Sequence, residues 1–387
     1  MDGQTMIDPW FTYKSWAEIS KSALINNLNV IREHAAATGT LVAPVVKANA
    51  YGHDAVLVVP ILEEAGVTHL CVATIDEAIT LREAGAKSDI LIFGTTRYEH
   101  VPFLKRYRLT ASIVFADEIQ EFAAESINAG GPPLPVHIKL DTGMSRFGFL
   151  VDSVYRAKTI EAMLAAAREP SLSVTGVYTH LATADCEPAY VAMQRERFIS
   201  TVSEAESYGF PRVKRHIASS AAIPGQPDNH FDMVRPGIAL YGGKAGPREP
   251  HWTKLRPVMT VKSIIEQIND VSAGTRVSYG GTWTLSRDSR LAVVNMGYAD
   301  GLSRLLSSKG HFYHKGREIP IVGRICMDRC IVDVTEIPDI CVRDEVMLFG
   351  EDAYVRKDAS DIASICGTID YEIFTGIKER VSRVLVE

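Results

Sequence analysis

Short apolar runs alternate with longer stretches of helical period from about residue 40 to residue 242. The apolar runs end near Gly, Thr, Asn or Ser, and in the stretches between them apolar residues recur every three or four positions. This alternation indicates repeated βα units with a parallel sheet. The predicted helices include residues 75–84, 117–129, 153–167 and 188–207.

Eight of the apolar runs are candidate strands. They cover residues 41–47, 69–73, 90–93, 111–115, 136–140, 174–179, 216–218 and 234–241. Eight βα units within about two hundred residues favour a closed (β/α)8 TIM barrel over an open doubly wound sheet.

The pattern changes after Gly242, where "KAGPREPHWTKLRP" is rich in Pro, Gly and charge. The segments that follow alternate with period two between Gly-containing turns, as strands do. The expected strands are "VMTVKSIIEQI", "RLAVVNM", "IPIVGRICMDRCIVDV" and "DEVMLFG", with one short helix near 359–366. We therefore predict an α/β chain: a TIM barrel over residues 14–244, then a mainly β C-terminal domain over residues 245–387, which residues 1–13 join.

Length and composition agree with this division. A chain of 387 residues exceeds what one hydrophobic core usually supports, and 46% apolar with 23% charged residues is typical of soluble globular proteins. A net charge of -6 argues against nucleic acid as a partner, because duplex binding depends on neutralising phosphates. No secretory signal or membrane-length apolar run is present, so we expect a cytoplasmic protein with no membrane partner. The six cysteines form no Cys-x-x-Cys pair, and no metal site is predicted.

Lys47 is the first residue that suggests chemistry. In "LVAPVVKANAYGH" it ends a wholly apolar strand, where an ammonium group is costly unless its charge is removed or used. The alternative is a lysine whose side chain reaches solvent at the strand tip. TIM barrels carry their chemistry at the carboxyl ends of the strands, which favours the functional interpretation.

Four other predicted strands carry polar residues at the same rim. Arg146, His180, Ser219 and Ser220 follow the fifth, sixth and seventh strands, and Arg235 lies in the eighth. Ser220, with a short helical start at Ala221, and the amides of Gly237 and Ile238 form a candidate phosphate cradle. Each feature alone also fits a helix cap or a turn glycine. A lysine, a phosphate cradle and arginines together suggest pyridoxal 5'-phosphate (PLP).

Eight segments across both domains carry a family resemblance. "VVKANAYGH", "KLDTGMSRFG", "YTHLATAD", "MVRPGIALYG", "VSYGGTW", "GYADG", "GRICMD" and "TIDYEIFTGI" resemble, in order, the motifs of the alanine racemase family. The resemblance implies a PLP-dependent isomerase that interconverts L- and D-alanine by a two-base mechanism and supplies D-alanine for peptidoglycan. It also implies a homodimer with shared active sites.

The resemblance implies two catalytic residues. Lys47 binds PLP covalently and is one proton-transfer base, and Tyr279 of the partner subunit is the other. Racemisation needs a base on each face of the substrate carbon, and the cofactor delocalises the carbanion. Taken alone, Tyr279 also fits an interface or core tyrosine.

Other residues are implied to surround the cofactor. Arg235 faces the pyridine nitrogen, where it cannot accept the ring proton, and His180 lies beside the ring. Without the resemblance, Arg235 also fits a salt-bridged residue and His180 a buried, hydrogen-bonded imidazole. The implied phosphate contacts are Tyr51, Ser220, Gly237, Ile238 and Tyr371.

The substrate pocket has its own implied residues. Arg146 positions the cofactor hydroxyl and the substrate carboxylate, while Met327 and Tyr298 of the partner subunit lie at the pocket and its entrance. Lys139 matches a lysine that is carbamylated in many members and holds this arginine in place. Surface charge or ordinary packing is the alternative for each.

Two departures and two rival functions accompany the resemblance. Asp54 stands where many members have glycine, and Ser219 where asparagine is common. A non-catalytic PLP-binding barrel protein would lack the β-domain motifs. A two-domain decarboxylase would place an acidic residue at the pyridine nitrogen, where this chain has Arg235.

Overall fold

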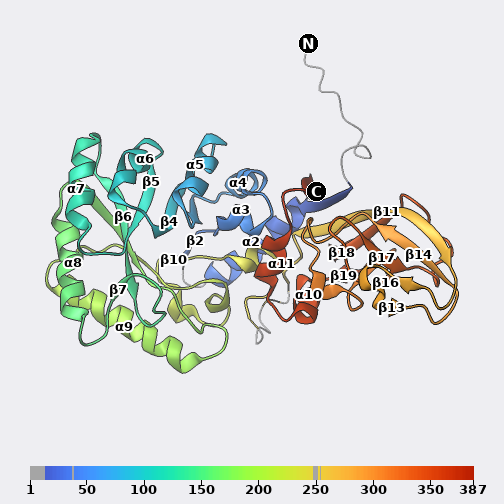
Figure 1. Cartoon of the computed structure of the whole chain (residues 1–387). Coiled ribbons are helices and arrows are strands. Elements are labelled where there is room, and N and C mark those ends of the chain that lie inside the picture. The colour runs from blue at the N-terminus through green and yellow to red at the C-terminus, as the bar shows by residue number, and fades with distance from the viewer. Residues whose placement is uncertain (1–13, 37–38, 247–251, 253) are drawn as a thin grey trace, which may run out of the picture.

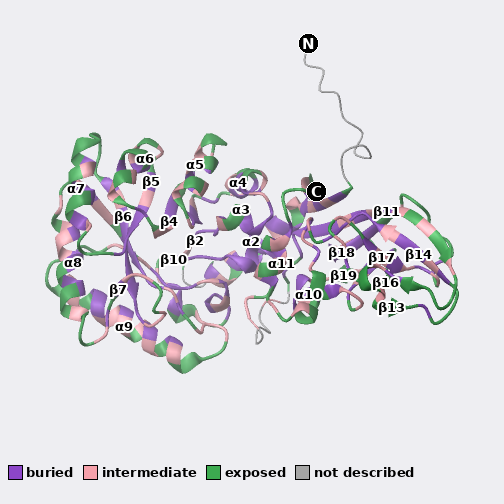
Figure 2. Ribbon diagram, in the orientation of Figure 1, coloured by how far each residue is buried: buried purple, intermediate pink, exposed green. Residues whose placement is uncertain are grey.

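The computed structural model describes residues 14–36, 39–246, 252 and 254–387. The molecule is elongated, with a barrel of strands and helices at one end and a β-rich domain at the other (Figure 1). Buried residues line the strands of both domains, and exposed residues cover the outer faces of the helices (Figure 2). None of the helices in the described ranges is long and apolar enough to cross a membrane.

Eight parallel strands form the barrel. Six of them lie in one sheet in the order β3-β4-β5-β6-β8-β9, and β10 pairs with β2. The parallel bridges Val45 to Cys71 and Ser219 to Arg235 join these two groups, so the ring of strands closes. The strands are β2 (Leu41–Val42), β3 (His69–Val72), β4 (Asp89–Thr95), β5 (Leu109–Ile113), β6 (Leu134–Asp141), β8 (Leu172–Tyr178), β9 (Lys214–His216) and β10 (Met233–Val234). The predicted TIM barrel is confirmed.

Helices surround the barrel because each buries one apolar face against the strands. They are α2 (Lys21–Ala36), α4 (Ala55–Glu64), α5 (Ile75–Glu83), α6 (Val101–Arg106), α7 (Ile119–Asn128), α8 (Arg156–Arg168) and α9 (Pro188–Ser207). The helix predicted over 188–207 has the same two ends in the structure, and the other three predicted helices begin or end within three residues of the observed ones.

Two predicted strands are much shorter than expected. The run 41–47 gives only β2 before the chain turns into a short helical segment, α3 (Lys47–Tyr51). The run 234–241 gives only β10, followed by a 3-10 helix, η4 (Ile238–Tyr241). In both places the backbone leaves the sheet at the barrel rim, and apolar periodicity alone cannot distinguish a buried strand from such a turn.

The second domain is built on a nine-stranded sheet of order β16-β15-β18-β11-β1-β20, with β14, β17 and β19 attached. Its strands are β1 (Ser15–Ser20), β11 (Met259–Val271), β14 (Ser289–Val294), β15 (His311–His314), β16 (Arg317–Pro320), β17 (Cys330–Asp333), β18 (Glu345–Glu351), β19 (Arg356–Lys357) and β20 (Ser382–Val386), with a separate hairpin of β12 (Arg276–Val277) and β13 (Trp283–Thr284). The helices are α10 (Ala359–Cys366), which matches the predicted 359–366, and α11 (Asp370–Gly376). The expected continuous strand over 319–334 is interrupted by loops between β16 and β17.

The first described strand belongs to the second domain. β1 (Ser15–Ser20) pairs antiparallel with β11 and parallel with β20. The barrel therefore begins after Ser20, and the predicted boundary at residue 14 differs from the structure. Six alternating residues cannot reveal partners that lie more than two hundred positions away. The placement of residues 1–13 with this domain lies outside the described residues.

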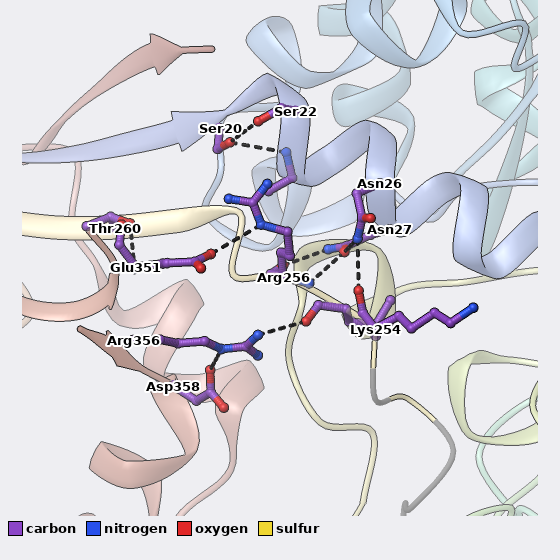
Figure 3. Close-up of polar contacts among 12 residues, drawn as sticks. Ser20, Ser22, Asn26, Asn27, Lys254, Arg256, Thr260, Glu351, Arg356 and Asp358 are labelled. Atoms are coloured by element: carbon purple, nitrogen blue, oxygen red, sulfur yellow. Dashed lines mark hydrogen bonds and ion pairs between the residues drawn. The ribbon is translucent and has the colours of Figure 1, made fainter. Parts of the chain in front are cut away.

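Polar contacts join the two domains around Asn27 of α2 (Figure 3). Its buried amide Nδ2 donates to the carbonyls of Leu240 at 3.0 Å and Arg256 at 2.8 Å, and its Oδ1 accepts from Arg256 N at 2.8 Å. The Arg256 side chain lies 3.3 Å from Glu351 of β18. These contacts tie the connecting segment to α2 of the barrel domain and to β18 of the second domain.

Candidate active site

A cavity of about 310 Å³ opens at the carboxyl ends of the barrel strands. Ten residues implicated by the sequence line it: Lys47, Tyr51, Lys139, Arg146, His180, Ser220, Arg235, Gly237, Ile238 and Tyr371. Tyr371 reaches it from α11 of the second domain. The fold thus brings together residues that are more than three hundred positions apart in the sequence.

Lys47 begins a left-handed helical turn. Ala48, Asn49, Ala50 and Tyr51 have φ of 51°, 53°, 54° and 53°. This conformation costs about 1–2 kcal/mol per residue, so surrounding contacts must stabilise it. The side chain of Asn49 accepts a hydrogen bond from Ala55 N at 2.8 Å.

Glu77 fixes the start of this turn. Its carboxylate accepts from Ala48 N at 2.6 Å and from Ala73 N at 2.8 Å, and it also completes the capping box of α5. The turn points both Lys47 and Tyr51 into the cavity. Burial, together with the nearby Arg146, lowers the pKa of Lys47, while Glu77 opposes the shift. The lysine is therefore closer to its neutral, nucleophilic form than a surface lysine.

The candidate phosphate cradle lies between β9 and η4. Ser220 Oγ accepts from Gly237 N at 2.9 Å and from Ala239 N at 3.3 Å. Gly237 is required by space, because a Cβ there would lie 2.4 Å from Tyr51 Oη. The rings of Tyr51 and Tyr371 lie 5.9 Å apart. Two phenols, a hydroxyl and backbone amides therefore converge on a small space, which fits a phosphate group.

Arg235 is 2% exposed, and no carboxylate pairs with it within the described residues. Its guanidinium donates to His216 Nδ1 at 2.8 Å and to the carbonyl of Thr179 at 2.9 Å. Burial lowers its pKa to about 10, so the group is still charged near neutral pH. A buried positive charge that faces a cavity is suited to donate a hydrogen bond to an acceptor atom of a ligand.

His180 lies at the same wall. Its Nδ1 is 3.5 Å from Arg235 Nη2, at the limit of a hydrogen bond. Burial, with the neighbouring arginines, lowers the pKa of His180 well below its usual range. The ring is neutral at physiological pH and acts as a polar wall rather than as a second cation.

Lys139 near the end of β6 and Arg146 on the loop that follows this strand both line the cavity. Lys139 is buried, and its Nζ lies 3.2 Å from the centre of the Phe147 ring. Burial, reinforced by Arg146, lowers the pKa of Lys139 to about 7. Asp141 accepts from the amides of Gly143, Ser145 and Arg146, the last at 2.9 Å. This carboxylate holds the loop in place.

Tyr279, Tyr298 and Met327 are absent from this cavity. They are 70%, 41% and 53% exposed on three loops of the second domain. The loops contact one another, since Ser278 Oγ donates to Arg324 O at 2.5 Å and Ala299 N donates to Met327 O at 2.9 Å. We call these three residues the β-domain surface. In Figure 1, β13, which follows Tyr279 closely in the chain, lies within the β-rich domain, apart from the barrel.

Several site residues escaped the sequence analysis. Tyr178 and Phe147 line the cavity, and His216 holds Arg235. Glu77 and Asp141 position the loops that carry Lys47 and Arg146. Tyr178 lies next to the end of the predicted strand 174–179, so its position was a usable signal, whereas the backbone contacts of the two carboxylates leave none in the sequence.

Comparison with known proteins identifies the family. The model for the alanine racemase N-terminal domain matches residues 19–245, and the model for the alanine racemase C-terminal domain matches residues 258–385. The chain belongs to the alanine racemase family, whose members are isomerases. An alanine racemase of Desulforamulus reducens is 39% identical over 373 residues, which cover 96% of this chain and 98% of that relative.

Solved structures of alanine racemases have the same fold. The alanine racemase of Streptomyces coelicolor A3(2) is 37% identical with a TM-score of 0.90, covering 98% of this chain and 100% of that one. The enzyme of Bacillus anthracis, solved with bound L-Ala-P, is 31% identical with a TM-score of 0.88, covering 97% and 96%. The enzyme of Bartonella henselae, solved with covalently bound pyridoxal phosphate, is 30% identical with a TM-score of 0.84, covering 96% and 99%.

Proposed function

We propose that this protein interconverts L- and D-alanine with PLP bound covalently to Lys47, and that it supplies D-alanine for peptidoglycan. The observation that carries the proposal is the single cavity shared by Lys47, the phosphate cradle and the buried Arg235. The covalent pyridoxal phosphate of the Bartonella henselae enzyme and the L-Ala-P of the Bacillus anthracis enzyme support it.

The residues present fit the cofactor. Tyr51, Ser220, Tyr371 and the amides of Gly237 and Ile238 would hold its phosphate, and the absence of a Cβ at Gly237, which lets the Tyr51 hydroxyl approach the cradle, supports this fit. Arg235 would donate to the pyridine nitrogen, with neutral His180 beside the ring. When bound, PLP stabilises the negative charge that develops when a proton leaves the substrate Cα.

Two bases exchange the Cα proton. Lys47, whose pKa is lowered, takes or returns it on one face at its Nζ. Tyr279 of the partner subunit does so on the other face at its hydroxyl. Arg146 holds the substrate carboxylate through its rigid pair of donors. Arg235 has no site to accept a proton, so it would leave the pyridine nitrogen unprotonated.

We propose a homodimer because the β-domain surface is exposed on its own protomer. A two-fold dimer would place Tyr279, Tyr298 and Met327 of the partner subunit over the cavity, where Tyr298 and Met327 would restrict the pocket to small side chains. The matched C-terminal domain disfavours a barrel-only PLP-binding protein, and Arg235 in place of an acid disfavours a decarboxylase.

Borohydride trapping tests the assignment. PLP-loaded protein is reduced and digested, and we expect the adduct on the peptide that contains Lys47, together with D-alanine formation from L-alanine in chiral analysis of unreduced protein. Lys47→Ala should lose the adduct, while Lys158→Gln, at an exposed lysine of α8, should keep it. An adduct on another lysine, or no D-alanine from loaded protein, would contradict the proposal.

A further inference from the structure

The amino-terminal end of the barrel contains a second cavity. Its volume is about 690 Å³, against about 310 Å³ for the active-site cavity. Its lining includes His69, Asp89 and Lys214, which begin β3, β4 and β9. The proposed racemisation needs nothing at this end, so the cavity calls for its own explanation. A volume in this range is typical of sites for small organic ligands.

His137 of β6 lies at the floor of this cavity. The side chain is buried, and its Nδ1 is 2.9 Å from Nε2 of His216. Its ring packs against Gly176 of β8, where a Cβ would lie 2.5 to 2.6 Å from three ring atoms. Glycine at this position therefore makes room for the imidazole. Within the described residues, the hydrogen bond of the His137 ring is made at Nδ1, and Nε2 makes none.

The direction of the hydrogen bonds at His137 follows from Arg235. Arginine has only donors, so His216 Nδ1 accepts from Arg235 at 2.8 Å. Burial, with Arg235 beside it, lowers the pKa of His216 well below its usual range, so the ring is neutral and its one proton lies on Nε2. That proton is donated to His137 Nδ1.

His137 must then carry its own proton on Nε2. Burial, reinforced by Lys214, lowers the pKa of His137 to about 3, so this ring is neutral as well. With Nδ1 accepting from His216, the remaining N–H is presented on the side of the cavity. A chain of two hydrogen bonds thus links Arg235 through His216 to His137, whose Nε2–H is a donor at the opposite end of the barrel.

The walls of the cavity are predominantly positive. Arg106, Arg108 and Lys214 line it, against one acidic side chain, Asp89. Lys214 Nζ lies 2.9 Å from His69 Nε2, which in turn lies 3.6 Å from Asp89. Apolar area comes from the residues Pro102, Pro132, Pro133 and Pro135. The site offers donors and positive charge beside apolar surface, which is suited to an organic anion.

We propose that this cavity binds a small organic oxyanion, a phosphate or carboxylate compound, with one oxygen accepting from His137 Nε2 and its charge facing Lys214. Because hydrogen bonds in a chain polarise one another, the bound anion would make His137 and then His216 better acceptors and would strengthen the bond from Arg235. Binding of the anion in this cavity would therefore change the hydrogen bonding of Arg235 at the active site. This coupling rests on the proposed function, whereas the binding itself does not.

Titration of the PLP-loaded protein at low ionic strength tests the binding. Inorganic phosphate and succinate are the two probes, and calorimetry is combined with the ¹⁵N shift of His137 Nε2 in histidine-labelled protein. We expect saturable binding of at least one probe with a shift at His137, and the probe that saturates identifies the oxyanion chemistry. No saturable binding of either probe, or binding without a shift at His137, would overturn the proposal.

Matched variants locate the site. Lys214→Gln should weaken binding about tenfold, because it removes a charged contact at an exposed position. Lys158→Gln makes the same change of charge on α8 and should leave the affinity unchanged. Binding that survives Lys214→Gln but is lost in Ser220→Ala would assign the anion to the active site instead and would overturn the proposal. Anion binding by a protein that forms no D-alanine would contradict the proposed function alone.

Discussion

The active-site cavity and the β-domain surface differ in how completely one chain determines them. Ten residues implicated by the sequence line the cavity, and only Arg146 among them is exposed. All ten belong to the barrel or to α11 of the same chain. The three residues of the β-domain surface are all exposed and contact no part of that cavity. One chain thus builds the part of the site that would hold the cofactor. In the proposed mechanism, the opposing base and the outer pocket would come from a second copy of the chain.

Backbone strain occurs in both regions, which supports a functional role for each. The left-handed turn after Lys47 and the positive φ of 61° at Ser278, next to Tyr279, are unfavourable for residues other than glycine. The first is fixed by the bond from Ala48 N to Glu77, and the second is fixed by the bond from Ser278 to Arg324. Folding alone would favour relaxed turns at both places.

Tyr279→Phe gives the largest effect expected for the β-domain surface. Removing the hydroxyl base should lower kcat about a thousandfold in both directions. The cofactor should still bind, because its contacts lie in the cavity. Chiral assays and the visible absorbance of loaded protein measure the two quantities. Loss of absorbance together with activity would show that Tyr279 supports the cavity, and the distinction between the two regions would fail.

Arg235→Glu tests the cavity side. A carboxylate would stabilise a protonated ring nitrogen, so racemisation should fall about a hundredfold while transamination of alanine to pyruvate rises. Arg235→Lys, which keeps the positive charge, should not raise pyruvate formation. Chiral analysis and coupled pyruvate detection separate the products. Unchanged racemisation in Arg235→Glu would show that this residue does not face the nitrogen.

Lys139 offers a smaller effect. With a pKa near 7, a large fraction of the amine is neutral at physiological pH and can add carbon dioxide, releasing a proton and leaving an anionic carbamate beside Arg146. We expect a ¹³C carbamate signal in protein equilibrated with labelled carbon dioxide, weakening as the pH falls below 7 because the protonated amine does not react. Lys139→Gln should lose the signal and raise KM about tenfold with little change in kcat. A signal that survives this substitution would come from another amine.

The sequence predicted the barrel and its rim because strand ends in a closed parallel sheet all face the same opening. Lys47, Ser220 and Arg235 could therefore be grouped before the fold was known. It did not predict the left-handed turn, because no residue in "KANAY" demands one. It also missed β1, whose partners lie in distant segments. The roles of Glu77 and His216 depend on tertiary contacts that leave no periodic signal.

Mixed dimers of two inactive variants test the shared site most directly. Lys47→Ala and Tyr279→Ala homodimers should both be nearly inactive, since every site in each lacks one base. After random exchange, half of the dimers are mixed and one of their two sites has both bases, so roughly a quarter of wild-type activity should return. Native mass spectrometry verifies the exchange. No recovery in a sample with verified mixed dimers would contradict an active site built from two chains.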